Sequence, residues 1–480
     1  MRRKFLINIV FLLSISLIIK AFWVLGIDRS VQNIAGEGAY GFYFSLFSFS
    51  VLFTLVLDMG LSGFNNRAVS ADPSRVRIYF GNVLLLRLAL TVAYFVITLS
   101  AAWALGYRGK QVSMLLILMI NQVIASLILW LRSNISGMQY LILDSLLSVA
   151  DRLIMIIICS VLLWGGVTNS PFRIEWFVWS QTAAYLTVLI ISFIIVIRKG
   201  GVSEVRPDAS VLKDIIIAGI PYAIVALAMT LYWRSDSVMI ERMLPDGTVQ
   251  AGNYAQSFRL FDAFAMIPVM FGSLLLPIFS KEISSGNDIS PLASMALRML
   301  LAPIAVIIIA LAVFSPEILD LLYVKPAANA VTTFRILMAT LLPVGLTYIY
   351  STILTAAGMM KRLALITGIA LIINVVLNLC LIPSLAGTGA AIASLVTQTF
   401  VAGLCVLSVK STKVKVINRR IGFAFLMVIM ATFAAGLIMR KLSMPWMPAA
   451  SLQLALGVAI VLISRLIEPV KSIKLLLQKQ

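Results

Sequence analysis

Fourteen apolar stretches, each about long enough to cross a bilayer, fill this chain almost from end to end. A hydrocarbon core of ~30 Å needs ~20 apolar residues of helix to cross it. Hydrophobic residues make up 61% of the chain and charged residues only 12%, whereas soluble proteins carry about 25% charged residues. The sequence therefore predicts an all-α integral membrane protein with almost no chain left over for a soluble domain.

The predicted transmembrane helices are predominantly apolar, and they span residues 5–25, 40–60, 80–103, 112–131, 141–164, 176–197, 212–233, 253–276, 294–314, 334–354, 362–382, 388–409, 421–439 and 449–467. With the N-terminus inside, the cytoplasmic segments carry 25 of the 38 Lys and Arg residues and the opposite loops carry 10. Cytoplasmic loops of membrane proteins collect Lys and Arg. We therefore expect a multi-pass protein with both termini in the cytoplasm.

Two polar breaks and a repeated motif divide the chain. The longest polar linker, 198–213, follows the sixth helix, and a second break, 410–420, follows the twelfth. Gly41-Phe-Tyr43 at the start of helix two matches Gly252-Asn-Tyr254 at the start of helix eight at an offset of 211 residues. This pattern predicts two pseudo-symmetric six-helix lobes around a central cavity, residues 1–200 and 201–410, followed by two C-terminal helices in residues 411–480.

Composition excludes several functional classes. The net charge of +19 fits basic cytoplasmic loops better than nucleic-acid binding. The chain has no histidine, and its three cysteines lie inside apolar runs with no disulfide framework or zinc spacing. No phosphate-binding loop or catalytic constellation is present. We therefore expect a protein that is not an enzyme and needs neither a metal nor another cofactor.

Charged residues within the predicted helices are the candidate functional residues, because a charge at bilayer depth costs at least ~2.5–3.5 kcal/mol. The cations are Lys20, Arg87, Arg234 and Arg259, and the carboxylates are Asp58, Asp236 and Asp262. Facing a cavity, the cations would bind an anionic substrate, while the carboxylates are candidates for coupling to an ion gradient. The alternative is structural: side chains near helix ends reach the headgroups, and Arg259 pairs with Asp262 three residues on.

Pro221 lies ten residues into the seventh predicted helix and is the strongest hinge candidate. Proline inside a transmembrane helix is tolerated where neighbouring helices or a cavity satisfy the freed backbone groups. A static kink is the alternative interpretation of the same residue.

Several stretches together resemble the bacterial polysaccharide flippases of the multidrug/oligosaccharidyl-lipid/polysaccharide exporter superfamily. The matching stretches are Gly36–Tyr43 (GEGAYGFY), Leu57–Leu61 (LDMGL), Ala218–Pro221 (AGIP) followed by Arg234–Asp236 (RSD), Gly252–Ala255 (GNYA), and Asn374–Pro383 (NVVLNLCLIP) followed by Gly387–Ala393 (GTGAAIA). The last pair is the most specific. The resemblance covers helices one to twelve, while the last two helices carry little family signal.

The resemblance implies a flippase for undecaprenyl-pyrophosphate-linked oligosaccharide, as in O-antigen, lipopolysaccharide or capsule assembly, in a bacterial inner membrane. It implies a lipid-linked substrate and membrane lipids as partners, with proton or sodium coupling and polysaccharide-assembly proteins as further candidates. We expect a monomer. A drug or cation exporter of the same superfamily and a lipid II flippase are the alternatives, and a polysaccharide polymerase is disfavoured because the chain has no large external loop.

Overall fold

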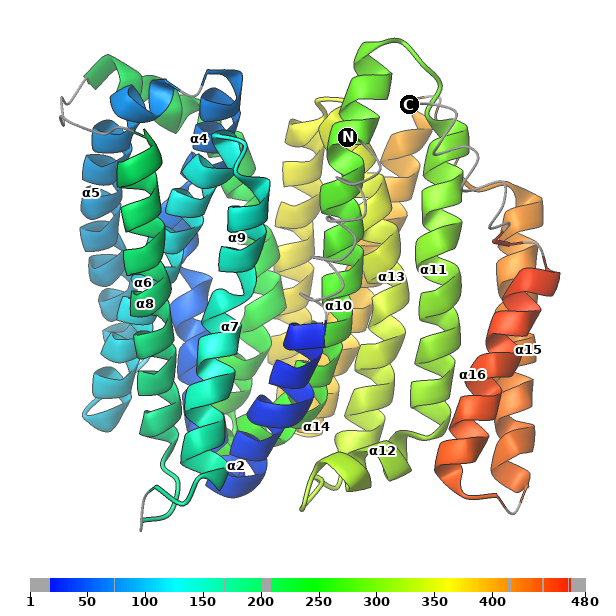
Figure 1. The fold of residues 1–480 in the computed structure, drawn as a ribbon. Coiled ribbons are helices and arrows are strands. Elements are labelled where there is room, and N and C mark those ends of the chain that lie inside the picture. The colour runs from blue at the N-terminus through cyan, green and yellow to red at the C-terminus, as the bar shows by residue number, and fades with distance from the viewer. Residues whose placement is uncertain are drawn as a thin grey trace. The chain divides into compact units, whose positions relative to one another are not determined.

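A computed structural model describes residues 18–72, 74–167, 170–200, 209–412, 414, 416–442, 444–464 and 466–467; the side chains of 209–223 and of a few other helical residues lie outside this description. The described residues form helices and no strand (Figure 1). The elements are η1 (Trp23–Asp28), α2 (Arg29–Leu52), α3 (Leu55–Asp58), α4 (Leu61–Ala71), α5 (Arg75–Ala104), α6 (Lys110–Gly137), α7 (Leu141–Trp164), α8 (Ile174–Gly200), α9 (Ala209–Met243), α10 (Gly247–Ser284), α11 (Ser290–Val313), α12 (Ser315–Leu322), α13 (Ala330–Ala356), α14 (Met360–Lys410), α15 (Arg419–Lys441) and α16 (Trp446–Ile463).

These helices confirm the predicted all-α membrane fold. Among the described residues, 11 helical stretches are long and apolar enough to cross a membrane. Two of them each hold two predicted spans across a backbone break, at Gly36 and at Ala386. The seventh predicted span lies in α9, and of the first predicted span residues 18–25 are described.

Helix one does not end where the sequence predicts. The helical backbone continues past residue 25, through the π-helical turn η1 and into α2, until Gly36 interrupts it with φ 80° and ψ 166°. The prediction ended the span too early because Asp28, Gln32 and Asn33 lower the local hydropathy. Asp28 and Gln32 are nevertheless buried, and therefore belong to the packed part of the helix.

The second break lies in α14, where Ala386 has φ 48° and ψ −130°. Pro383 precedes it, and Gly389 follows so closely that a Cβ there would lie 2.5 Å from the Leu381 carbonyl oxygen. The short polar gap between predicted helices eleven and twelve is thus a tight reversal of the chain that needs glycine on its far side.

The chain divides into two compact units, Met1–Ala255 and Gln256–Gln480. In the first unit α9 packs on α2, and α6 packs on α4 and α8. In the second unit α13 packs on α11 and α14. The predicted division at residues 200 and 410 stays a prediction.

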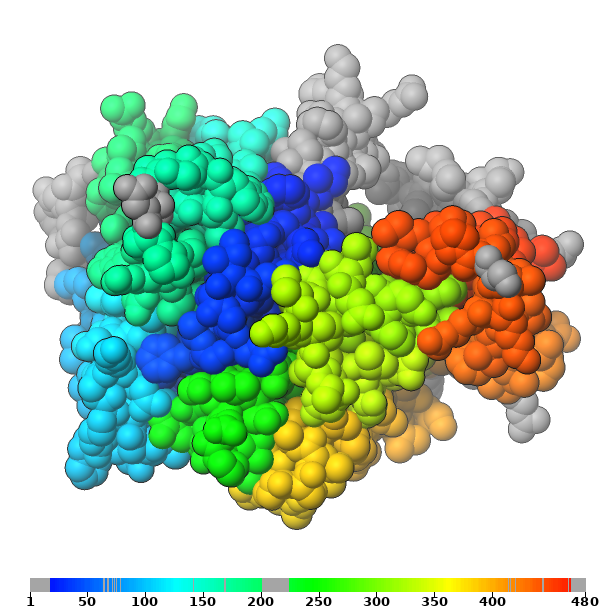
Figure 2. All heavy atoms as spheres, turned by 90° about the horizontal axis from the view of Figure 1, so that it is seen from below, coloured from blue at the N-terminus to red at the C-terminus, as the bar shows by residue number. Residues whose placement is uncertain are grey.

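The two C-terminal helices pack against α11 of the second unit, and Figure 2 shows their ends in orange and red beside the yellow-green segment that follows α11. Gly457 of α16 faces Val306, where an added Cβ would lie 2.4 Å from a methyl carbon. Gly436 of α15 similarly accommodates the fully buried Gln453, whose amide donates to the Thr432 carbonyl at 3.3 Å. These close approaches fix the α15–α16 pair to the second unit.

The repeated glycine motif forms a contact within the first unit. A Cβ on Gly41 would lie 1.8 Å from the Thr248 carbonyl oxygen, and one on Gly252 would lie 2.1 Å from the Glu37 carbonyl oxygen. The offset of 211 residues maps Glu37 onto Thr248 and Gly41 onto Gly252. The contact between α2 and the first residues of α10 is therefore reciprocal, as in a local two-fold arrangement.

Pro221 lies in α9, but its side chain is outside the described residues, so its role as a hinge stays a prediction. Prolines occur inside other helices as well, at Pro268 and Pro277 of α10, Pro303 of α11, Pro343 of α13 and Pro383 of α14.

Candidate functional site

Arg87 of α5 has partners at both terminal nitrogens of its guanidinium, and we call this group the Arg87 cluster. Its guanidinium forms an ion pair with Asp58 and donates to the hydroxyls of Ser62 at 2.8 Å and Ser126 at 2.6 Å. It also donates to the Leu57 carbonyl at 3.3 Å. Arg87 is only 2% exposed. Two residues that the sequence assigned to separate roles, a substrate-binding cation and an ion-coupling carboxylate, thus neutralise each other in this structure.

The backbone around Asp58 explains why these groups meet. The short helix α3 ends at Met59 and Gly60, which take left-handed conformations with φ 42° and 80° before α4 begins. This break leaves the Leu57 carbonyl without a continuing helix to donate to it, because the last carbonyls of a helix have no intrahelical partner. Arg87 supplies the missing donor and a counter-charge for Asp58.

A cavity of about 300 Å³ adjoins the cluster within the first unit. Asp58 and Ser126 line it, with Thr54, Gln122 and Thr230 as further polar residues. The Asp58 side chain is 26% exposed and that of Arg87 is 1% exposed. The carboxylate is therefore the charged group that the cavity reaches, while the guanidinium lies behind it.

Lys20 lies deeper than the sequence predicts. Helix one continues to residue 35, so Lys20 lies 15 residues, or ~22 Å, from that end of the helix. Its charge interacts with Arg152 and Asp151 of α7 and with Arg132 of α6. Arg132 is paired with Asp144 at 2.7 Å, and Arg152 lies over the ring of Trp23 at 5.3 Å. We call Lys20, Trp23, Asp151 and Arg152 the Lys20 cluster.

The sequence prediction missed the buried carboxylate of Asp28, which is 1% exposed at the end of η1. The Tyr40 hydroxyl donates to it at 2.9 Å and the Gln32 amide at 3.2 Å. The signal was present in the spacing, since Asp28 and Gln32 are one helical turn apart. Assigning that stretch to a loop concealed it.

Two of the predicted residues lie close together in α9. Asp236 is 1% exposed, and its carboxylate accepts a hydrogen bond from the Tyr254 hydroxyl at 3.0 Å. Arg234 is half-buried two residues earlier. Tyr254 belongs to the repeated motif, so this contact ties the start of α10 to α9.

The other two predicted residues, Arg259 and Asp262, lie in the second unit and are half-buried on α10. Asp262 interacts electrostatically with Tyr348 of α13. These placements are compatible with either the cavity role or the structural role, which both stay predictions.

A polar cluster that the sequence did not indicate ties the segment between α5 and α6 to the end of α9. The Glu241 carboxylate accepts hydrogen bonds from Tyr107 at 3.1 Å and Gln111 at 3.2 Å. Arg242 pairs with Glu241 at 2.8 Å and lies 3.5 Å over the Tyr107 ring. Burial, with the neighbouring Glu241 carboxylate, raises the pKa of Tyr107, which keeps its phenol protonated as a donor.

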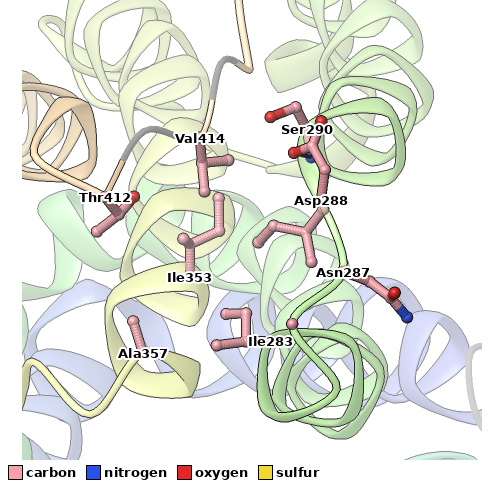
Figure 3. A pocket seen from close by; sticks show the side chains of 10 residues that line it. Ile283, Asn287, Asp288, Ser290, Ile353, Ala357, Thr412 and Val414 are labelled. Atoms are coloured by element: carbon pink, nitrogen blue, oxygen red, sulfur yellow. Dashed lines mark hydrogen bonds between the residues drawn. The ribbon is translucent and has the colours of Figure 1, made fainter.

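A second cavity, of about 620 Å³, lies within the second unit at the ends of α10, α13 and α14 (Figure 3). Asn287, Asp288 and Ser290 bring polar groups to it, and Ile283 and Ile353 form its apolar side. None of the predicted site residues lines this cavity.

Two protein families match the sequence. The family described as "Polysaccharide biosynthesis protein" matches residues 7–282, and the family described as "Lipid II flippase MurJ" matches residues 145–457. No curated protein matches the sequence.

Solved transporter structures match the fold. The lipid II flippase MurJ in an inward closed conformation has a TM-score of 0.69 at 13% identity, covering 95% of this chain and 97% of that one. An outward-facing MATE family multidrug resistance transporter has a TM-score of 0.60 at 14% identity, covering 84% and 94%. A transporter of the MOP superfamily from Pyrococcus furiosus has a TM-score of 0.59 at 16% identity, with the same coverage.

Proposed function

This chain belongs to the family of polysaccharide biosynthesis proteins and lipid II flippases, and on that premise we propose that it moves an anionic, lipid-linked oligosaccharide across a bacterial inner membrane. The substrate class is a polyprenyl-pyrophosphate-linked repeat unit, such as those of O-antigen, lipopolysaccharide or capsule. Both termini would lie in the cytoplasm, as the distribution of Lys and Arg indicates.

The observation that carries this proposal is the cation Lys20, which is partly exposed ~22 Å inside helix one. Among the described residues it makes no hydrogen bond or ion pair. A cation at this depth is costly unless an anion or water meets it. The pyrophosphate of a lipid-linked sugar provides such an anion, while its polyprenyl tail remains in the lipid.

The mechanism we propose is alternating access. Two six-helix lobes would enclose a cavity lined by cations, with Arg259 and Arg234 joining Lys20, and Pro221 would allow α9 to bend. The cations would replace water around the pyrophosphate through charge-assisted hydrogen bonds while the cavity opens first to one side and then to the other. Arg87 would act by positioning Asp58 rather than by direct contact, because it is 2% exposed and already paired.

Ion coupling is the part of the proposal that concerns the carboxylates. Asp58 reaches a cavity, Asp236 is buried beside Tyr254, and Asp262 is half-buried. A proton or sodium ion bound at one of them would link the opening of the lobes to a gradient. Transport in proteoliposomes that ignores both pH and sodium gradients would contradict this coupling.

A second candidate function is export of drugs or other cations, since MATE transporters have the same fold. A cationic substrate favours buried carboxylates at the site. Asp28 and Asp236 are such carboxylates, each 1% exposed. Transport of lipid II is the third candidate, and it uses the same pyrophosphate chemistry.

The test is a flipping assay with the purified full chain in proteoliposomes. Fluorescent lipid-linked oligosaccharides of the O-antigen and lipid II types would be offered in parallel with a fluorescent organic cation. We expect the outer-leaflet signal of a lipid-linked oligosaccharide to become protected in the presence of the protein. Movement of the cation without either lipid would overturn the proposal in favour of the exporter. Complementation of a flippase-deficient strain, with Arg259→Ala as the comparison, checks the same point in cells.

A further inference from the structure

The cavity beside the Arg87 cluster, which we call the Asp58 cavity, lies deep within the helices of the first unit. Its volume is about 300 Å³, and residues of α3, α6 and α9 line it. Gln122 on its wall is twelve residues after the first residue of α6, Lys110, and fifteen before the last, Gly137. These separations correspond to ~18 Å and ~22 Å along the helix axis. The Asp58 cavity is therefore far from both ends of α6.

α6 presents two different faces, one toward this cavity and one toward the protein core. The residues of α6 that line the cavity are Gln122, Ala125, Ser126 and Leu129. Their spacing of three and four positions places them along one side of the helix. Ile124 and Ile128, between them in the sequence, are buried in the hydrophobic core of the first unit. Packing of the core face thus fixes the side chains of the cavity face in position.

The two oxygens of the Asp58 carboxylate have different surroundings. Oδ1 accepts hydrogen bonds from the Arg87 guanidinium and from both the hydroxyl and the backbone amide of Ser62. No residue that the structure describes donates a hydrogen bond to Oδ2. The side chain is 26% exposed and lines the cavity. Oδ2 is therefore an acceptor available to a molecule in the Asp58 cavity.

Gln122 and Thr230 add further polar groups to the same cavity. Both side chains are half-buried, and within the described part of the chain neither the Gln122 amide nor the Thr230 hydroxyl forms a hydrogen bond. An amide has donors and an acceptor, and a hydroxyl has one donor and two acceptor positions. Polar groups without a partner are costly in an apolar environment. A ligand that carries both donors and acceptors would satisfy Asp58, Gln122 and Thr230 together.

The charge of the Asp58 cavity is balanced. Among the residues that line it, Asp58 is the one charged side chain, and Arg87 pairs with it from behind. The two opposite charges offset each other at a distance, while the carboxylate oxygens still accept hydrogen bonds. Leu55, Ala125 and Leu129 form the apolar part of the wall. This combination favours an uncharged ligand that is rich in hydroxyls and has an apolar side.

From these observations we propose that the Asp58 cavity binds one uncharged sugar ring of the lipid-linked substrate, with Asp58 Oδ2 accepting a hydrogen bond from a sugar hydroxyl and Gln122 and Thr230 pairing with others. This inference rests on the proposed function and adds to it a site for the glycan, separate from the cations that would meet the pyrophosphate. Arg87 is then a positioning residue, because it holds Oδ1 and leaves Oδ2 for the sugar.

The chemistry and the size both fit a sugar ring. A hydroxyl that donates to a carboxylate forms a stronger hydrogen bond than one between two neutral groups. The C–H groups of a sugar ring can pack on the apolar part of the wall. Small-molecule sites have volumes of about 300–1,000 Å³, so this cavity is at the lower limit and suits one ring rather than a chain of several.

The test compares ligands that differ only in the sugar. Isothermal titration calorimetry on the full chain in nanodiscs would measure binding of geranylgeranyl diphosphate alone and of the same lipid carrying one glucose, galactose or N-acetylglucosamine. We expect at least one sugar to raise the affinity of the wild type about tenfold, equivalent to ~1.4 kcal/mol. Removing single hydroxyls from that sugar should abolish most of the gain at one or more positions, because a site built to bind a hydroxyl rejects an analogue that lacks it.

Gln122→Leu and Thr230→Val remove polar groups from the cavity and leave the Arg87 cluster intact. Each puts an apolar side chain of similar volume in place of a polar one. We expect each to reduce the gain from the sugar about threefold, the order expected for one hydrogen bond between neutral groups. Thr187→Val is the matched control, because Thr187 is exposed on α8 and donates to the Ala183 carbonyl at 2.9 Å. It should keep the full gain.

The outcomes separate the two proposals. If the wild type flips a lipid-linked oligosaccharide, yet no sugar raises the affinity or both cavity variants keep the full gain, the sugar site is wrong and the proposed function stands. If the two variants keep the gain and instead lose a sodium dependence of flipping, the cavity binds a cation and the sugar site is again wrong. If the wild type neither binds a lipid diphosphate nor flips a lipid-linked oligosaccharide, both proposals fail.

Discussion

The Arg87 cluster and the Lys20 cluster lie in the same unit, and both place basic side chains inside transmembrane helices, yet they differ in nearly every other respect. Arg87 is 2% exposed, paired with a carboxylate and hydrogen-bonded to two hydroxyls and two carbonyls. Lys20 and Arg152 are partly exposed, and both lie near the Asp151 carboxylate. The first arrangement encloses a buried cation among its partners, and the second holds two partly exposed cations near each other.

The difference shows that depth in a helix does not by itself indicate function. Arg87 and Lys20 are both intramembrane cations, and a cost of burial applies to each. What distinguishes them is the supply of partners from neighbouring segments. The broken helix at Asp58 provides Arg87 with a counter-charge and a carbonyl, while the π-helical turn places the Trp23 ring under Arg152 in the Lys20 cluster.

The largest effect is expected from breaking the Arg87 cluster. Asp58→Leu removes the counter-charge and leaves a buried guanidinium without it, which costs ~3–5 kcal/mol. We expect a strong fall in the thermal unfolding midpoint in nanodiscs and a lower membrane level of the protein. An unfolding midpoint equal to that of the wild type would show that the guanidinium is solvated in the folded protein.

The double variant Asp58→Leu/Arg87→Leu sharpens the same point. Replacing both members of a buried ion pair by apolar residues is often neutral. We expect the double variant to recover most of the stability that Asp58→Leu loses, as measured in a double-mutant cycle. Additive losses would mean that the two side chains act independently.

A smaller effect is expected from Arg87→Lys. The charge remains, but an ammonium lacks the planar fork that reaches Ser62, Ser126 and the Leu57 carbonyl together. Losing one or two of these hydrogen bonds costs ~1–3 kcal/mol. The unfolding midpoint should lie between those of the wild type and Asp58→Leu, and a value below that of Asp58→Leu would contradict the assignment.

A still smaller effect is expected from Arg132→Gln. Arg132 and Asp144 form a short pair, but their side chains are 23% and 24% exposed. Partly exposed pairs contribute ~0.2–1 kcal/mol. The same unfolding measurement should detect a small shift, and a loss as large as that of Asp58→Leu would place this pair with the Arg87 cluster.

The smallest change in stability is expected from Lys20→Met. Removing one of several like charges relieves repulsion worth a few tenths of a kcal/mol, so stability stays within about 0.5 kcal/mol of the wild type. Its effect should appear in flipping of the lipid-linked oligosaccharide instead. A large loss of stability together with unchanged flipping would reverse the comparison between the two clusters.

Much of the fold could be predicted from the sequence, because a bilayer imposes a single strong requirement on helix length and hydropathy. Where they are described, the fourteen apolar stretches lie mainly in helices, although 40–60 includes the turns on either side of α3 and 449–467 extends past the end of α16. The end of helix one could not be predicted, because Asp28 and Gln32 find partners inside the protein rather than in water. Hydropathy measures transfer of a side chain alone and does not include such partners.

The candidate site was less predictable. Arg87 and Asp58 could be recognised as intramembrane charges, but their pairing across 29 positions depends on the left-handed turn at Met59 and Gly60. Arg152 lies inside the predicted span 141–164 but was not singled out as a candidate, because Asp144 and Asp151 beside it gather charge at the start of that span. Whether a charge is neutralised or left accessible is a tertiary property, which residue spacing along one helix does not contain.

The reciprocal contact of Gly41 and Gly252 has a mechanical consequence. At both glycines the nearest atoms of the other helix are backbone atoms, since an added Cβ would meet a carbonyl oxygen there. Interdigitated side chains must change rotamer or lose contacts before two helices turn against each other. Where backbone faces backbone, no side chains interlock. At Gly41 and Gly252, α2 and the start of α10 can therefore rotate against each other without side-chain repacking.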